Sequence, residues 1–410
     1  MTLARLGVFA LLLAAPVAVA GSGDWPQFRG PTGTGVAASD KLPDKWSQTE
    51  NLAWKVELPG PGTSSPVVWG EKMYLTCQTG SGESLKRHLL CLDRKNGATL
   101  WSRDVPAKLP EQERIREDHG YASSTPAVDA ERVVVFFGKS GVYAFDHGGR
   151  ELWQADVGSK VHIWGSAASP VLVGDLVVVN ASVESESVVG LDRTTGKVRW
   201  RLPGVRESWA TPVVVTPPGG KPELVVPMFR KVLGIDPATG KQLWTCDTEI
   251  NWYMVPSVVA HDGVAYLVGG RSGGALAVRV GGRGDVTRTH RLWIGKKGSN
   301  VTSPVYHDGK LYWMNDNTGV AYRADAKTGA VEYEHRVEGA AQVYASPVLA
   351  GGKVYYLARD GRTFVVRAGP AFDLVATNDL RDRTPFNSSP AVAGDQLLIR
   401  SNRYLYCIGK

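Results

Sequence analysis

Residues 190–200 read GLDRTTGKVRW. In this stretch an aspartate is followed by a glycine four positions later and by an aromatic residue eight positions later. The aspartate can bond the backbone of a turn, the glycine tolerates positive φ, and the aromatic residue begins the next strand. The chain is therefore built from a repeat, because the same spacing recurs at Asp93/Gly97/Trp101, Asp236/Gly240/Trp244 and Asp325/Gly329/Tyr333, with Asp146/Gly149/Trp153 one residue shorter.

A proline, in most copies preceded by serine or threonine, marks each repeat. The eight prolines lie 60, 44, 42, 44, 48, 43 and 43 residues apart, and at Pro256 the serine follows instead of preceding. Short apolar blocks separated by Gly/Asp turns predict hairpins within each copy. Four strands per copy and eight copies predict an all-β, eight-bladed β-propeller of four-stranded antiparallel blades. The prolines are at positions 66, 126, 170, 212, 256, 304, 347 and 390.

The motif in residues 190–200 resembles the tryptophan-docking repeat of pyrroloquinoline-quinone (PQQ) dehydrogenase-like propellers. The propeller subunit of the outer-membrane β-barrel assembly machinery is built from a similar repeat. The resemblance covers residues 51–410, and the opening residues 25–31, WPQFRGP, are similar to the start of a group of secreted PQQ-like proteins without an agreed activity. It implies two alternative functions, a non-enzymatic binding scaffold or a PQQ-dependent dehydrogenase.

The first and last repeats are each incomplete. The last copy, residues 387–408, supplies three apolar blocks, whereas residues 51–58 form an unpaired strand that carries Trp54. An open sheet edge at each end would invite aggregation. We therefore expect residues 53–58 to pair with residues 403–408, so that an N-terminal strand closes the ring.

Residues 1–20 have the pattern of a secretory signal peptide. Arg5 is followed by an apolar run over residues 8–15 and by the small-x-small triplet Ala18-Val19-Ala20. We expect cleavage near Ala20, an N-terminal extension over residues 21–50 and the propeller over residues 51–410. The mature protein is expected to be a monomer in the periplasm or outside the cell, without a transmembrane segment, since no later apolar stretch approaches the roughly 20 residues needed.

Charge and motifs exclude several functional classes. The 47 basic and 40 acidic residues give a net charge of +7 without a Lys/Arg-rich run, which argues against binding of duplex nucleic acid. The sequence contains no His-Glu-x-x-His, Gly-x-Ser-x-Gly or Walker-type motif, so we predict no catalytic residues and no metal site.

The tryptophans that share one repeat position are predicted to dock neighbouring blades and not to bind a ligand. An aromatic ring at the start of an outer strand can wedge against the next repeat, and truncating a buried tryptophan costs about 3–5 kcal/mol. These blade-docking residues are Trp54, Trp101, Trp153, Trp200, Trp244 and Trp293.

The four cysteines allow three disulfide connectivities in an exported protein. Cys91 and Cys407 occupy a repeat slot that is filled elsewhere by alanine or glycine, which favours free buried thiols; the state of Cys77 and Cys246 stays open. The quinone-dependent alcohol dehydrogenases of the resembling family stack their cofactor on a ring of vicinal cysteines, and this sequence has none. We therefore expect no cofactor for the scaffold, and PQQ with calcium only under the dehydrogenase alternative.

Repeat topology predicts where a ligand would bind. If the Ser-Pro strand is innermost, the segment leading into it and the turn between the second and third strands emerge on one face. Aromatic planes and guanidinium groups around a central mouth suit an anionic, flat or sugar-like ligand, or an acidic segment of an envelope protein. The alternative is that they only pack loops and pair with neighbouring acids. The predicted binding residues are Trp164, Trp209, Tyr253, Tyr344, Arg230, Arg271, Arg359 and Arg400.

Overall fold

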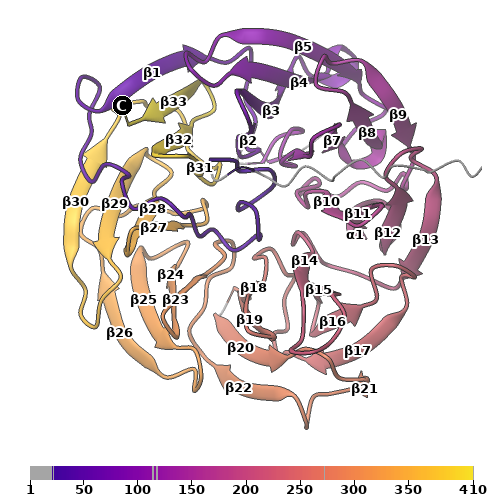
Figure 1. The fold of residues 1–410 in the computed structure, drawn as a ribbon, viewed down its shortest axis with the longest axis vertical. Coiled ribbons are helices and arrows are strands. Elements are labelled where there is room, and N and C mark those ends of the chain that lie inside the picture. The colour runs from indigo at the N-terminus through magenta and orange to yellow at the C-terminus, as the bar shows by residue number, and fades with distance from the viewer. Residues whose placement is uncertain (1–20, 22, 113–114, 117–118, 272, 410) are drawn as a thin grey trace, which may run out of the picture.

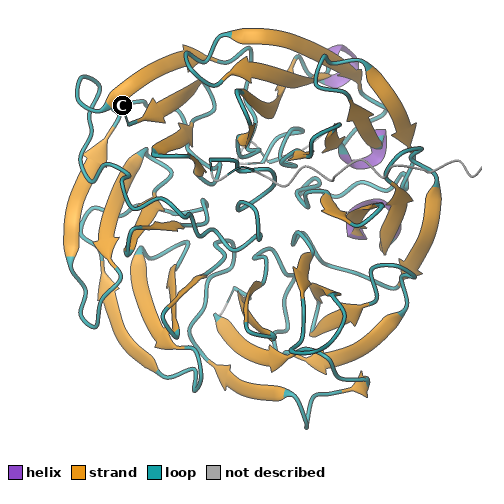
Figure 2. Ribbon diagram, in the orientation of Figure 1, coloured by secondary structure: helices purple, strands orange, loops and turns teal. Residues whose placement is uncertain are grey.

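The computed structural model describes residues 21, 23–112, 115–116, 119–271 and 273–409. The expected signal peptide, residues 1–20, lies outside them. Eight sheets stand around a central axis (Figure 1), so the predicted all-β, eight-bladed propeller is confirmed. Within the described residues, helix is confined to η1 (Gly82–Ser84), η2 (Gly138–Ser140) and α1 (Ser182–Ser185), all in turns (Figure 2). No described helix has the length and apolar character to cross a membrane.

The blades are numbered in chain order around the ring, and the strands of each blade are given from the innermost to the outermost. Blades 1 to 4 consist of β2 (Val67–Trp69), β3 (Lys72–Thr79), β4 (Lys86–Asp93) and β5 (Thr99–Pro106); β6 (Ala127–Val128), β7 (Val133–Phe136), β8 (Val142–Phe145) and β9 (Glu151–Ala155); β10 (Val171–Val173), β11 (Leu176–Ala181), β12 (Ser187–Asp192) and β13 (Val198–Pro203); and β14 (Val213–Val215), β15 (Glu223–Met228), β16 (Lys231–Ile235) and β17 (Gln242–Asp247).

Blades 5 to 8 follow the same order around the ring. They consist of β18 (Val259–His261), β19 (Val264–Gly269), β20 (Gly274–Arg279) and β22 (Arg291–Gly295); β23 (Val305–His307), β24 (Lys310–Met314), β25 (Val320–Asp325) and β26 (Val331–Arg336); β27 (Val348–Ala350), β28 (Lys353–Leu357), β29 (Arg362–Arg367) and β30 (Leu374–Asp379); and β31 (Ala391–Ala393), β32 (Gln396–Arg400), β33 (Tyr404–Ile408) and β1 (Leu52–Glu57).

Blades 8 and 4 depart from the simple repeat. In blade 8 the early strand β1 pairs antiparallel with β33, with Lys55 opposite Tyr406. In blade 4 a short fifth strand, β21 (Gly284–Asp285), pairs in parallel with β17. It comes from the connection between β20 and β22, which folds back so that Val286 is buried and Trp244 is fully covered.

A glycine of the next blade lies under most of the outer-strand tryptophans. The glycine takes positive φ, and an added Cβ would meet the indole: at Gly196 it would lie 2.5 Å from Cε3 of Trp153, and at Gly240 it would lie 2.4 Å from Cε3 of Trp200. Trp54, Trp101 and Trp293 meet Gly97, Gly149 and Gly329 in the same way. Trp244 differs, because its Nε1 donates to Glu223 of its own blade. The Asp-x-x-x-Gly spacing thus makes the flat surface on which an indole packs.

Hydroxyl groups link the innermost segments of successive blades. The backbone N–H of Ser65 donates to Oγ1 of Thr125 at 2.9 Å, and that of Thr125 donates to Oγ of Ser169 at 3.0 Å. Five further bonds of 2.9–3.0 Å continue the series around the axis through Thr211, Ser257, Ser303, Ser346 and Ser389. We call these eight residues the hydroxyl belt. Ser257 keeps its place in the belt although its proline precedes it.

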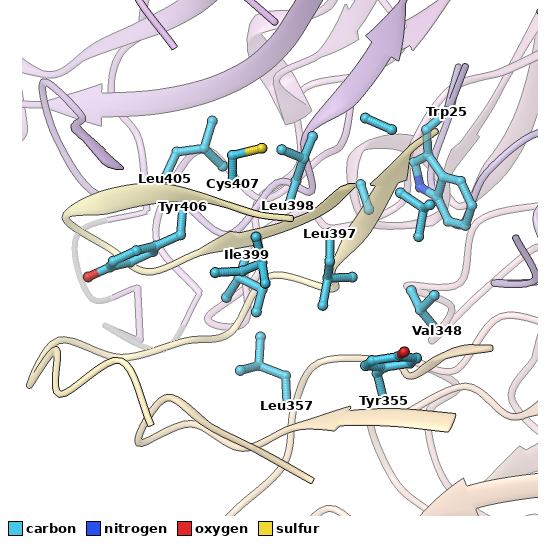
Figure 3. Close-up of a cluster of buried hydrophobic side chains, with 14 of the residues drawn as sticks. Trp25, Val348, Tyr355, Leu357, Leu397, Leu398, Ile399, Leu405, Tyr406 and Cys407 are labelled. Carbon is cyan, nitrogen blue, oxygen red and sulfur yellow. The ribbon is translucent and has the colours of Figure 1, made fainter. Parts of the chain in front are cut away.

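The N-terminal extension is folded onto the ring. Trp25 and Val68 exchange two backbone hydrogen bonds of 3.0 and 2.9 Å, and residues 35–37 bond the backbone of Leu349 in blade 7. Figure 1 shows this indigo segment crossing the centre of the ring before it reaches β1. Trp25 belongs to the same buried cluster as Leu397 of blade 8 and Val348 of blade 7 (Figure 3). The segment therefore joins blades that are distant in sequence.

Candidate functional site

A cavity of about 920 Å³ opens on the end of the ring where segments lead into the innermost strands. We call this end the mouth face and the other end the rear face. Two kinds of segment line the cavity, as the repeat topology requires: segments before an innermost strand, such as Trp164 before β10, and turns between second and third strands, such as Arg271 between β19 and β20. The cavity lies toward blades 2 to 7.

An aromatic cluster forms one wall of this cavity. Tyr253 lies at its centre, with ring centroids 5.5 Å from Trp209, 6.0 Å from Trp164 and 5.1 Å from Trp252. Tyr344 lines another part of the wall. Trp209 is buried, whereas the other rings are partly exposed. The cavity wall therefore contains several partly exposed aromatic rings.

Backbone bonds between neighbouring blades fix this cluster. The N–H of Trp209 donates to the carbonyl of Met254 at 2.7 Å, and the N–H of Met254 donates to the carbonyl of Glu207 at 2.9 Å. The indole Nε1 of Trp209 also donates to the carbonyl of Gly165 at 2.7 Å. Segments leading into blades 3, 4 and 5 are thus held together, so the rings have little freedom to move apart.

Two arginines of the cavity wall stack on indole rings. The guanidinium carbon of Arg116 lies 4.5 Å from the ring centroid of Trp164, and that of Arg271 lies 5.8 Å from that of Trp252. Such contacts orient the guanidinium plane and are worth about 0.5–1 kcal/mol at exposed sites. Arg116 comes from the long loop after β5 and is not among the predicted binding residues, because this loop has no counterpart in the other repeats.

Five of the eight predicted binding residues line the cavity together: Trp164, Trp209, Tyr253, Tyr344 and Arg271. Two others lie beside it. Arg230 donates from Nε to Oδ1 of Asn251, and Arg359 stacks on Tyr344 with its guanidinium carbon 4.4 Å from the ring centroid while donating to Gln342.

The eighth residue, Arg400, does not reach the cavity. Its side chain is 1% exposed, and its Nη1 donates to the carbonyl and hydroxyl of Ser64 at 2.8 and 2.7 Å. Burial lowers the pKa of Arg400 to about 10. The repeat position is the same as that of Arg271, but the inner segment of blade 1 covers Arg400: an added Cβ on Gly62 would lie 2.6 Å from its Nη2.

The charges of the cavity wall are balanced. Arg116 and Arg271 are matched by two carboxylates, Glu207 and Asp316. Asp316 is 2% exposed and accepts bonds from the hydroxyl of Ser299 at 2.9 Å and the backbone N–H of Asn300 at 2.7 Å. The lining thus lacks the surplus of positive charge that the predicted arginines would give.

Below the cavity, an axial channel of about 130 Å³ continues toward the rear face. Trp209, Tyr344 and Val255 line both the cavity and the channel, while seven of the eight hydroxyl-belt residues line the channel and not the cavity. Phe28 of the N-terminal extension lines the channel and also a separate groove on the rear face. The side chain of Phe28 therefore stands between the channel and the rear face, at the bottom of a funnel. Residues 25–31, WPQFRGP, precede the first repeat and carry none of its spacing, so the repeat did not predict this role for Phe28.

The loop after β5 is anchored beside the funnel. Its Glu111 pairs with Arg87 at 2.5 Å, with side chains 9% and 3% exposed, and Arg87 also donates to Ser140 at 3.0 Å. The phenol of Tyr121 donates to the carbonyl of Gln112 at 2.5 Å. The described part of the loop is thus a fixed wall that carries Arg116. Residues 113–114 and 117–118 of this loop lie outside the described residues.

Glu184, in α1, is a buried carboxyl group close to this anchor. It is 2% exposed and accepts a hydrogen bond from the Ser166 hydroxyl. Burial raises the pKa of Glu184 to about 7, and the nearby Glu111 acts in the same direction, while the bond from Ser166 opposes the shift.

The cavity wall lacks the ring of vicinal cysteines on which the resembling dehydrogenases stack PQQ. All four cysteines are free and buried in the blades, and none lines the cavity. Among the described residues no three His, Cys, Asp or Glu side chains converge as a metal site. PQQ itself carries three carboxyl groups, whereas the wall offers as many carboxylates as guanidinium groups.

Comparisons with known proteins agree with this architecture. A sequence profile of the family described as outer membrane protein assembly factor BamB matches residues 47–212, 90–334 and 229–409. No curated protein matches the sequence. Among solved structures, BamB from Moraxella catarrhalis is similar with a TM-score of 0.63 and 15% identity, covering 87% of this chain and 96% of that chain.

Two dehydrogenases share the fold with similar TM-scores and similarly low sequence identity. A europium-containing methanol dehydrogenase has a TM-score of 0.69 and 14% identity, covering 92% of this chain and 90% of that chain. A quinohemoprotein alcohol dehydrogenase from Comamonas testosteroni has a TM-score of 0.66 and 11% identity, covering 95% and 81%. At such identities the likeness concerns the fold alone.

Proposed function

The chain belongs to the family described as outer membrane protein assembly factor BamB, and from this premise we propose that it is a non-enzymatic binding scaffold of the cell envelope that uses its mouth face. The proposal includes export to the periplasm or beyond, with the protein acting as a monomer. Its partner is an envelope protein or a cell-surface or polysaccharide ligand. The mouth face around the cavity offers surface for an envelope protein, and the cavity offers a recess for a cell-surface or polysaccharide ligand.

The funnel is the observation that carries this proposal. It combines a cavity of about 920 Å³ with partly exposed aromatic rings and has Phe28 at its bottom. Ligand sites in proteins are concave, largely apolar and fixed by a few polar groups. The wall meets this description, and its rings are held by bonds between blades. The geometry supports binding and retention of a ligand.

A pull-down from the native envelope fraction tests the proposal. We expect the double variant Arg271→Ala/Arg359→Ala to lose most of the partner recovered by the unchanged protein. The matched control is a double variant of exposed arginines away from the mouth, Arg199→Ala/Arg367→Ala, which should recover the partner normally. Normal recovery with the mouth variant, together with loss in the control, would overturn the proposal.

The second candidate function, a quinoprotein dehydrogenase, rests on the shared fold with the methanol and alcohol dehydrogenases. Adding PQQ with calcium and measuring cofactor absorbance after gel filtration separates the two candidates. The scaffold proposal expects no retained absorbance. Retention of one equivalent of PQQ would favour the dehydrogenase.

A further inference from the structure

We propose that the mouth-face cavity binds a neutral saccharide. This inference rests on the proposed function and names the ligand of the same site. It follows from the size of the cavity, the balance of charges in its lining and the chemistry of its wall.

The size of the cavity favours a small or chain-like ligand. At about 920 Å³ it falls within the range of roughly 300–1,000 Å³ that is usual for small-molecule sites. A folded protein partner needs about 800 Å² of surface on each side, which is usually broad and not deeply recessed. A few linked sugar rings fill such a recess, and a longer polysaccharide can leave it through the open mouth.

The charges of the wall favour a neutral ligand. Arg116 and Arg271 are balanced by Glu207 and Asp316. Both guanidinium groups already lie over indole rings, at 4.5 and 5.8 Å. Arg230 and Arg359 lie beside the wall. Within the lining itself an anionic ligand would gain from two arginines and lose a comparable amount to two carboxylates, whereas an uncharged ligand needs no charged partner.

The side chains of the wall suit a sugar ring. A pyranose has faces of C–H groups that stack on aromatic rings and a rim of hydroxyl groups that both donate and accept hydrogen bonds. Trp164, Trp252 and Tyr344 line the cavity, each with a guanidinium group over one face of its ring, and we place the sugar ring on the opposite face. Amide side chains, which also donate and accept, stand around these rings and match the hydroxyl rim. The amides of the wall are Asn251, Asn300, Asn317 and Gln342.

Isothermal titration of the full chain with a panel of neutral oligosaccharides tests this inference. The panel contains α- and β-linked oligomers of glucose, galactose, mannose and N-acetylglucosamine. We expect at least one member to bind, with an affinity that changes less than about twofold between 50 and 500 mM salt, because exposed ionic contacts are screened over this range. Trp252→Ala should weaken binding by about tenfold or more, while Trp252→Phe keeps an aromatic face and should stay within about threefold.

The matched control is Trp69→Ala, a half-buried tryptophan in blade 1 that lies outside the cavity wall. It should bind like the unchanged protein, and circular dichroism on all variants checks that they fold. Absence of binding to every neutral oligosaccharide overturns the inference. The inference is also overturned if only acidic sugars bind and their affinity depends strongly on salt. Binding of a proline-rich peptide that depends on Trp252 would overturn it as well. If the sugar titrations fail while the pull-down still depends on Arg271 and Arg359, the scaffold proposal stands and only its ligand is wrong.

Discussion

Trp54 on β1 and Cys407 on β33 are Cα partners across the antiparallel pair of blade 8. The same relationship places a small residue opposite the tryptophan in five other blades. The slot therefore makes room for an indole, and a cysteine fits it as a small apolar residue. The other five pairs are Cys91/Trp101, Ala144/Trp153, Gly190/Trp200, Gly234/Trp244 and Ala277/Trp293.

Replacing Cys407 by alanine should lower the free energy of unfolding by less than about 1 kcal/mol, because alanine already fills this slot in blades 2 and 5. Gly190→Ala is the contrasting variant, since its Cβ would lie 2.2 Å from Cε2 of Trp200, and overpacking of this kind costs about 1–3 kcal/mol. Urea unfolding measures both. A loss of about 2–5 kcal/mol for Cys407→Ala, the range for a native disulfide, would contradict the free-thiol reading.

Thr125→Val should destabilise the ring through the hydroxyl belt. The substitution keeps the shape of the side chain but leaves the buried N–H of Ser65 without its acceptor. An unsatisfied buried donor costs about 1–3 kcal/mol. Thr99→Val, on the exposed edge of β5, is the control and should be close to neutral. Equal stability of both variants in urea unfolding would show that the belt contributes nothing.

The sequence predicted the blades well because the features that specify them are local. Aspartate, glycine and tryptophan act within one turn and its flanking strands, so their spacing can be read without knowing the neighbouring blade. The sequence indicated the positions of the hydroxyl-belt residues but not the hydrogen bonds between them. Ser/Thr-Pro marked each repeat, but the acceptor of each N–H lies about 42–60 residues further along the chain, and at Ser257 the hydroxyl is kept while the proline moves.

The other features of the structure depend on contacts that do not recur from blade to blade, so the repeat could not predict them. The N-terminal extension has no periodicity, and its partners Val348 and Leu397 lie more than 300 residues away. Arg400 and Arg271 share a repeat position, yet one is buried and the other exposed, because different inner segments lie above them. The balance of charge in the cavity could not be predicted either, since Asp316 and Arg116 reach it from turns of very different length.

Trp25→Ala should cost about 3–5 kcal/mol, because the side chain is 2% exposed and packs against Gly30, where an added Cβ would lie 2.8 Å from the indole. Trp69→Ala, a half-buried tryptophan, should cost less. Thermal unfolding compares the two variants. A loss for Trp25→Ala no larger than that for Trp69→Ala would mean that the N-terminal extension adds little to the stability of the ring.

Stability should fall as pH rises because of Glu184. Burial raises the pKa of this carboxyl group from 4.5 to about 7, so the folded state holds the proton more tightly than the unfolded state. The contribution of Glu184 to the free energy of unfolding is therefore complete below about pH 4.5 and is lost as the pH rises to about 7. Glu184→Gln stays neutral, so at pH 8 it should be more stable than the unchanged protein by up to about 3 kcal/mol, with little difference at pH 4.

Urea unfolding at pH 4 and at pH 8 measures this difference, and Glu71→Gln on the exposed turn after β2 is the control. The control should change stability equally at both values. A Glu184→Gln variant that is no more stable than the unchanged protein at pH 8 would rule out a proton on Glu184 as the source of the pH dependence.

The most direct test of the mouth face is photo-crosslinking in the native envelope. Phe229 is 38% exposed and lines the cavity, whereas Leu100 is 49% exposed on the outer strand β5. Benzoylphenylalanine placed at either position keeps an aromatic or apolar side chain at an exposed site. Our account predicts a crosslinked adduct from position 229 that disappears when Arg271 and Arg359 are both replaced by alanine, and no adduct from position 100. An adduct from position 100 with none from position 229 would contradict it.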